Sequence, residues 1–174
     1  MKLAVIDFET TGSVWGFENE PWQVGLVYLI DGEICMEGGL DLLIRVDPNR
    51  PFNPMAPGRY RELRSDLAVA SSCGDVLDRI LERTAGCIPA AHNVATERTL
   101  LSRLAPLHRW GEWMDSLKLA RTIFPGLQEY GLESLIERLD IKNEIGRLCP
   151  GRTSHDAYYD AVASAVLFKH MGIK

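Results

Sequence analysis

Residues 3–12 of the chain read LAVIDFETTG, a run of apolar side chains followed directly by two acidic ones. Apolar residues at four consecutive positions, Leu3–Ile6, predict a β-strand covered on both faces. Because side chains alternate across a strand, Asp7 and Glu9 project from the same face, with Cα atoms about 6–7 Å apart. A divalent cation, which prefers carboxylate oxygens, would relieve the repulsion between them. The alternative is a solvated turn in which a threonine or the aspartate only caps the backbone.

Further strands are predicted in the first half of the chain. Apolar runs indicate strands at residues 22–30 and 40–46, and the Asp31-Gly32 pair indicates a turn after the first of them. Prolines recur at every third residue from 48 to 57, so residues 47–58 are expected to form a loop.

Helical periodicity dominates the second half of the chain. The predicted helices cover residues 75–84, 96–104, 117–123, 132–139 and 156–171, with one short strand at 87–91. Strands first and helices later, with a strand between helices, predict a mixed α/β fold in a single domain, residues 1–174.

Composition narrows the classes of protein that fit. The net charge of −5 argues against a protein that coats nucleic acid with a basic surface, but it does not exclude an enzyme that holds metal ions with clustered carboxylates, so composition is otherwise neutral on function. No apolar run approaches the roughly 20 residues of a membrane span, and Met1-Lys2 leads directly into the first strand. We therefore expect no membrane association and a cytoplasmic location. The four cysteines, without C-x-x-C spacing, are expected to be small buried hydrophobes.

A second polar segment, AHNVATE at residues 91–97, joins the short strand to a helix. Asn93 is expected to be the N-cap, and Glu97 lies in the first helical turn, where the helix dipole favours a negative charge. This role accounts for Glu97 structurally; the functional alternative directs it at the same cation as Asp7. His92 is expected to be packed or hydrogen-bonded rather than a metal ligand.

A third polar segment, TSHDAYYDA at residues 153–161, precedes and begins the last helix. Thr153 and Asp156 fit a capping box. Asp160 should face inward, and a buried carboxylate needs a partner, which a cation shared with the acidic pair of the first strand would supply. His155 lies just before the helix. Histidine is suited to take a proton from water near neutral pH, although an exposed helix-start residue is the alternative.

Together the three segments resemble the DEDDh exonuclease family, which includes the proofreading subunit of bacterial DNA polymerase III and ribonuclease T. The first matches through DFETTG at residues 7–12, and the second through AHN at residues 91–93. The third matches through the H-x-x-x-x-D spacing of His155 and Asp160. Further segments that look like family sequence are QVG at 23–25, LKLAR at 117–121 and FPGL at 124–127.

The resemblance implies a ribonuclease H-like fold, with a central mixed five-stranded sheet flanked by helices. It also implies a 3′→5′ exonuclease that acts on single-stranded 3′ ends of DNA or RNA and releases nucleoside 5′-monophosphates. Two Mg²⁺ or Mn²⁺ ions would be bound per active site. Asp7 would bridge them, Glu9 and Asp160 would complete the first site, and Glu97 would support the second. His155 would be the general base.

The substrate contacts that we expect come partly from the resemblance and partly from an unusual insertion at residues 13–20. Gly12 should turn the chain sharply and leave its two preceding threonines exposed at the rim. Trp15 and Phe17 in the insertion either stack on bases or pack inward against Trp22. Arg59, Arg61 and Arg64 either contact phosphates or form a solvated basic face. The residues expected to bind substrate are Thr10, Thr11, Gly12, His92, Asn93, Trp15 and Phe17.

One departure from the family concerns Thr96 and Glu97, where relatives usually carry an aromatic residue and an aspartate. Glutamate extends the carboxylate by one methylene, about 1.3–1.5 Å. We expect the first metal site to persist and the second to change. The alternative function is a catalytically weakened module that binds strand ends or a partner protein. Whether the chain works alone, as a homodimer or with a polymerase is left open.

Overall fold

A five-stranded mixed sheet forms the centre of the structure, a computed structural model that describes all 174 residues. The strands are β1 (Lys2–Thr10), β2 (Pro21–Ile30), β3 (Glu33–Leu43), β4 (Ile88–Ala91) and β5 (Met114–Asp115). Their order in the sheet is β3-β2-β1-β4-β5. The β1–β2 and β2–β3 pairs are antiparallel, whereas β1–β4 and β4–β5 are parallel. The predicted mixed sheet is confirmed.

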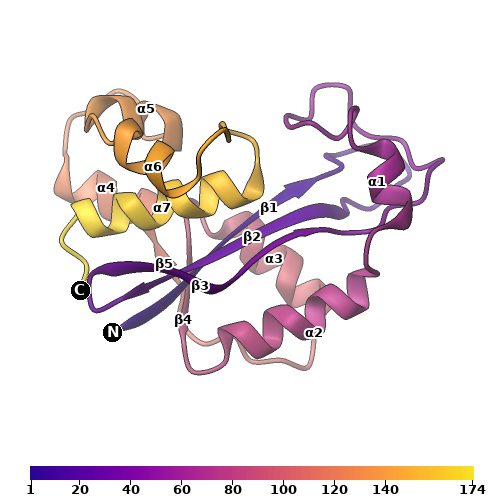
Figure 1. Cartoon of the computed structure of the whole chain (residues 1–174), viewed down its shortest axis with the longest axis horizontal. Coiled ribbons are helices and arrows are strands. Elements are labelled where there is room, and N and C mark those ends of the chain that lie inside the picture. The colour runs from indigo at the N-terminus through magenta and orange to yellow at the C-terminus, as the bar shows by residue number, and fades with distance from the viewer.

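Helices cover both faces of this sheet (Figure 1). They are α1 (Arg64–Val69), α2 (Cys73–Thr84), α3 (Ala95–Leu104), α4 (Ser116–Ile123), α5 (Leu132–Arg138), α6 (Lys142–Leu148) and α7 (Ala157–His170). The α4–α7 group lies on one face, and α2 and α3 lie on the other. None of the helices combines the length and apolar character needed to cross a membrane.

The two faces of β1 carry alternate residues of the strand. Leu3 and Val5 belong to the core on the α7 side, whereas Ala4 and Ile6 belong to the core on the α2–α3 side. The strand extends to Thr10, further than the apolar run predicts, so the acidic pair continues the face that carries Leu3 and Val5.

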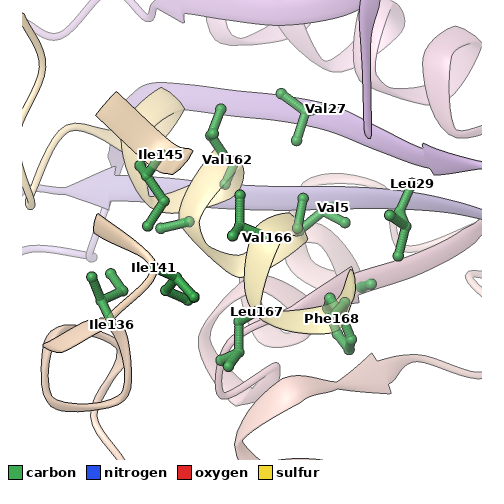
Figure 2. Close-up of a cluster of buried hydrophobic side chains, with 14 of the residues drawn as sticks. Val5, Val27, Leu29, Ile136, Ile141, Ile145, Val162, Val166, Leu167 and Phe168 are labelled. Carbon is green, nitrogen blue, oxygen red and sulfur yellow. The ribbon is translucent and has the colours of Figure 1, made fainter. Parts of the chain in front are cut away.

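The last helix, α7, is buried around nearly its whole circumference, as expected for a helix that is apolar on all sides. Figure 2 shows Val162 and Val166 of α7 between the strand residues Val5 and Val27 and the side chains of α5 and α6. This packing fixes the axis of α7 against β1 and β2. As a result, α7 begins beside the carboxyl end of β1 (Figure 1).

Three elements were not predicted, namely α1, α6 and β5. They contain six, seven and two residues, which is too short for a periodic pattern to stand out. The predicted strand at 40–46 begins at Glu33 instead. The turn at Asp31 and Gly32 has φ angles of 50° and 85°, and this two-residue turn starts β3 immediately.

The expectation that all four cysteines are buried is wrong for three of them. Only Cys149 is buried, and it packs in the core beneath α7. The three partly exposed cysteines are Cys35, Cys73 and Cys87.

Candidate active site

Three of the predicted site residues, Glu9, His155 and Asp160, lie together where β1 ends and α7 begins. One potential ligand atom of each lies within 4.8 Å of the others. The backbone N–H of His155 donates to Oδ2 of Asp160 over 3.0 Å, and His155 adopts a left-handed φ of 62°. This turn leads the chain from the exposed His155 into the helix, and the His155 N–H provides the Asp160 carboxylate with a hydrogen-bond donor.

The QVG segment on β2 places α7 against the sheet. Gly25 pairs with Asp7 across the β1–β2 ladder. A Cβ atom at Gly25 would lie only 2.2 Å from the carbonyl oxygen of Ala157. The Ala157 N–H also donates to Oε1 of Gln23 over 3.4 Å. The sequence pointed to this segment only by resemblance; its role is to let the start of α7 approach the acidic strand.

Asp7 and Glu97 complete the acidic set. Both line a cavity of about 300 Å³ that also contains Glu9, His155 and Asp160. Glu97 lies in the first turn of α3 and is 4% exposed. Its Oε2 atom is buried without any hydrogen-bond partner. A buried oxygen without a partner carries a large desolvation cost, which a bound cation would offset.

All four carboxylates of this cavity hold their protons unusually strongly. Burial raises the pKa of Asp7 well above its ordinary value, and the charges of Glu97, Asp160 and Glu9 raise it further. Burial, with the charge of Asp160, raises the pKa of Glu9 to about 8. Burial also raises the pKa of Glu97 and that of Asp160 to about 7 each, although the hydrogen bond from the His155 N–H opposes the rise at Asp160.

These residues fit divalent cations. Carboxylate oxygens are the ligands that Mg²⁺ and Mn²⁺ prefer, and a cation would offset the burial cost, and with it the mutual repulsion, that raise the pKa values. Glu97, whose Oε2 atom lacks a hydrogen-bond partner, lines the same cavity as the other three carboxylates. The donor set therefore matches the family expectation of metal ions at this site.

The proline-rich loop, residues 47–58, closes over the site. Gly58 has a φ of 88°, and a Cβ atom there would lie 2.8 Å from Trp22, 3.1 Å from the His155 carbonyl oxygen and 3.3 Å from Oε2 of Glu9. The Pro-Gly pair signals a turn in the sequence, but the residues that it touches are set by tertiary structure. In the middle of the loop, the Asn53 N–H donates to the Thr11 carbonyl over 2.8 Å.

The expectation that Thr11 is exposed at the rim is wrong. Thr11 is fully buried, and its hydroxyl accepts the N–H of Glu20 over 3.0 Å. Its carbonyl accepts Asn53, as described above, so its polar groups serve the insertion and the proline-rich loop. Thr10 and Gly12, by contrast, line the catalytic cavity.

The second segment also differs from its prediction in one respect. Asn93 is not the N-cap of α3, because Val94 holds that position and makes no side-chain capping bond. Asn93 has a φ of 64°, and its N–H donates to Oδ1 of Asp115 over 3.1 Å. The exposed side chain of Asn93 lines the cavity.

His92 is hydrogen-bonded, as predicted. Its Nδ1 lies 2.8 Å from Ser116 Oγ and its Nε2 lies 3.0 Å from the Tyr130 carbonyl oxygen. Both ring nitrogens are therefore engaged within the protein, although the ring lines the cavity.

The predicted capping box of α7 is wrong in detail. Asp156 is itself the N-cap, and its side chain accepts the N–H groups of Tyr158 and Tyr159. Thr153 makes no capping bond. The helix thus begins two residues after His155, with only the N-cap between them, and holds the histidine close to its first turn.

The insertion at residues 13–20 projects Trp15 into solvent. Trp15 is 98% exposed, so inward packing against Trp22 is wrong for this residue. Phe17 is about half exposed, and the guanidinium of Arg50 lies 4.7 Å from its ring centre. Arg50 also donates to the Glu18 carbonyl, so the base of the insertion is held in place.

The arginines after the proline-rich loop have different partners. Arg61 donates to the Pro54 carbonyl over 2.9 Å, and Arg64 donates to the Arg50 carbonyl over 2.8 Å. These two side chains hold the loop. Arg59 makes no such bond and lines a neighbouring cavity.

The sheet order and the acidic cavity define an exonuclease of the DEDDh type. A family model described as Exonuclease, that of the RNase T family, matches residues 4–168. The chain belongs to this family and is a hydrolytic nuclease by that membership.

Individual relatives agree with this assignment. The chain is 29% identical over 167 residues to Exodeoxyribonuclease 10 of Escherichia coli K12, covering 95% of this chain and 66% of that protein. It thus spans just under two thirds of that relative's length. It is also 28% identical over 138 residues to 3′-5′ exonuclease DinG of Staphylococcus saprophyticus, covering 77% of this chain and 15% of that protein.

Solved structures share the fold. The structure of Exonuclease X in complex with 5′ overhanging duplex DNA has a TM-score of 0.73 and 26% identity, covering 97% of this chain and 90% of that one. The nuclease domain of 3′hExo, a DEDDh family member bound to rAMP, has a TM-score of 0.75 and 16% identity, covering 98% and 90%. The latter likeness concerns the fold alone.

Proposed function

We propose that residues 1–174 form a single exonuclease domain that removes nucleotides from the 3′ end of a nucleic-acid strand. Its products are nucleoside 5′-monophosphates, and it requires two divalent cations, Mg²⁺ or Mn²⁺. The observation that carries this proposal is a set of four carboxylates around one cavity, two of them buried and two partly buried, with raised pKa values and an unpartnered oxygen on Glu97, beside an exposed histidine.

Each residue has a distinct part in this proposal. Asp7 lies among the other carboxylates and would be shared by both cations, Glu9 and Asp160 would hold the first, and Glu97 would hold the second. When bound, such cations neutralise charge on the phosphate and favour deprotonation of the attacking water. His155 would accept the proton of that water, and its own backbone bond to Asp160 keeps it at the edge of the cation site.

Substrate contacts are proposed for the groups that face the cavity and its surroundings. Thr10, Gly12 and Asn93 line the cavity and would seat the terminal nucleotide, with His92 behind them. The exposed ring of Trp15 and the half-exposed ring of Phe17, two residues further along the insertion, would offer stacking surfaces for bases.

A labelled-strand assay tests this function. Single-stranded DNA and RNA labelled at the 5′ end would be incubated with the protein in Mn²⁺, in Mg²⁺ or in chelator. We expect a metal-dependent ladder that shortens from the 3′ end, and no ladder with Asp7→Ala, which removes the shared carboxylate. Metal-independent cleavage, or an Asp7→Ala rate within a few-fold of the unmodified protein, would reject the proposal.

The second candidate, a weakened module that binds strand ends or a protein, has one observation in its favour. Glu97 and Thr96 replace the residues usual in the family, and Glu97 is the carboxylate whose oxygen lacks a partner. Binding of the labelled strand without a ladder in either metal would decide for this module.

A further inference from the structure

A second cavity adjoins the catalytic one at His155. Its volume is about 390 Å³, and its lining is mostly polar. The residues that matter here are Gln23, Arg59, Arg152, Thr153, Ser154 and His155. Because His155 lines both cavities, a group bound in the second cavity lies next to the reacting groups of the first.

The acidic side chains of this second cavity already have partners. Arg152 forms ion pairs with Asp41 of β3 and, over 2.8 Å, with Asp156. Asp156 also accepts two N–H groups at the start of α7. The two acids share the single guanidinium of Arg152, which leaves one net negative charge among the three side chains, and the cation of Arg59 brings the cavity lining to neutrality.

Arg59 is the cation that remains without an intramolecular partner. Its guanidinium takes part in no hydrogen bond, ion pair or ring contact, whereas Arg61 and Arg64 are committed to the loop. Its backbone is nevertheless fixed, because its carbonyl accepts the N–H groups of Glu62 and Leu63. The preceding residue, Gly58, packs on the His155 carbonyl, so the backbone of Arg59 is held beside the histidine while its exposed guanidinium is free to reach a ligand.

We propose that this second cavity binds a phosphodiester of the retained strand, the one immediately 5′ to the scissile phosphate. Arg59 would contact its oxygens with the planar fork that suits phosphate, and the hydroxyls of Thr153 and Ser154 would donate to them. The inference rests on the proposed function and adds to it a site that positions the strand without touching the leaving nucleotide.

Equilibrium binding tests the site directly. The probe is a 5′-fluorescein oligothymidylate, measured by anisotropy with Ca²⁺ in place of Mg²⁺ so that the strand stays intact. A second set of probes carries one neutral methylphosphonate at each phosphate in turn, counted from the 3′ end. We expect Arg59→Ala to raise Kd about tenfold, as for loss of a hydrogen bond to a charged group. It should also lower the slope of log Kd against log salt by about 0.7.

Measuring each methylphosphonate probe with both the unmodified protein and Arg59→Ala identifies the phosphate that Arg59 contacts. A methylphosphonate at the second position should weaken binding by the unmodified protein about tenfold and have no further effect on Arg59→Ala. Losses that add, or an unchanged Kd for Arg59→Ala, overturn the site. The same holds if Arg59→Ala weakens binding of thymidine 5′-monophosphate rather than the oligomer, since the cavity would then hold the released product.

Two controls separate this result from other causes. Arg79→Ala removes the same charge from α2, on the other face of the sheet, and should leave Kd within twofold. Arg59→Lys should keep most of the salt slope. Laddering of the unmodified protein is measured separately: an intact ladder with an unchanged Arg59→Ala Kd rejects only the second cavity, whereas absence of the ladder rejects the proposed exonuclease function.

Discussion

In the absence of divalent cations, the free energy of unfolding of the protein should fall as the pH rises from 5 to 8.5. In the unfolded chain the four carboxylates of the cavity ionise near their ordinary values, around pH 4. In the folded protein, burial and mutual repulsion raise the pKa of Glu9 to about 8 and those of Glu97 and Asp160 to about 7. Raised folded-state pKa values stabilise the fold below about pH 4; this contribution falls as the pH rises above the unfolded values and is fully lost once the pH has passed the folded values near 7 and 8.

The magnitude follows from the shift at one residue. One pKa unit corresponds to about 1.4 kcal/mol, so Glu9 alone would contribute roughly 4 kcal/mol between pH 5 and its folded pKa. The other three carboxylates are also shifted upward by burial, so the value of about 4 kcal/mol for Glu9 is a lower bound on the total loss. For a chain of this size a loss of about 4 kcal/mol lowers Tm by about 8–16 °C.

Thermal unfolding followed by circular dichroism, in chelator and in saturating Mn²⁺, measures this effect. Mn²⁺ should raise Tm most at high pH, because protons and cations compete for the same oxygens. Glu9→Gln should flatten the profile in chelator. A Tm in chelator that is constant, or rises, between pH 5 and 8.5 would refute the reasoning.

Three further changes test individual residues. His155→Ala should reduce cleavage roughly 10²–10⁴-fold at neutral pH while strand binding persists; an unchanged rate and pH profile in a kinetic assay would leave His155 as a helix-start residue only. Glu97→Asp should raise activity in Mg²⁺ more than in Mn²⁺, because Mg²⁺ demands stricter geometry; a fall in both, with a constant ratio of the two rates, would show that α3 already accommodates glutamate. Gly25→Ala should displace α7, lower the free energy of unfolding measured in denaturant by about 1–3 kcal/mol, and abolish cleavage in parallel. In the control, Gly146→Ala in α6, the added Cβ atom meets no atom within 4 Å, so stability should be unchanged or raised.

The sequence predicts those parts of the site that depend on local periodicity. Alternation along β1 places Asp7 and Glu9 on one face, and that face is the one covered by α7. The apolar pattern of α7 similarly predicts that Asp160 faces inward. Both predictions depend only on the residues adjacent in the sequence, so the structure agrees with them.

Contacts between distant segments could not be predicted in this way. The burial of Thr11 depends on Asn53 and Arg50, which come from the proline-rich loop some forty residues later in the chain. The difference between Arg59 and its two neighbouring arginines likewise depends on where the loop carbonyls lie. Gly25 is required by the Ala157 carbonyl, which no local pattern reveals.

The order in which the site residues occur along the chain has a consequence for synthesis of the protein. Asp7 and Glu9 lie on the first strand, but His155 and Asp160 are supplied by the turn before α7 and by α7 itself, the last helix. A nascent chain that has not yet emerged beyond Gly151 holds three of the four carboxylates of the site and lacks both Asp160 and the histidine. The nuclease therefore cannot assemble its cutting centre while most of the polypeptide is still being made on the messenger RNA, and it acquires this centre only when α7 docks on Gly25.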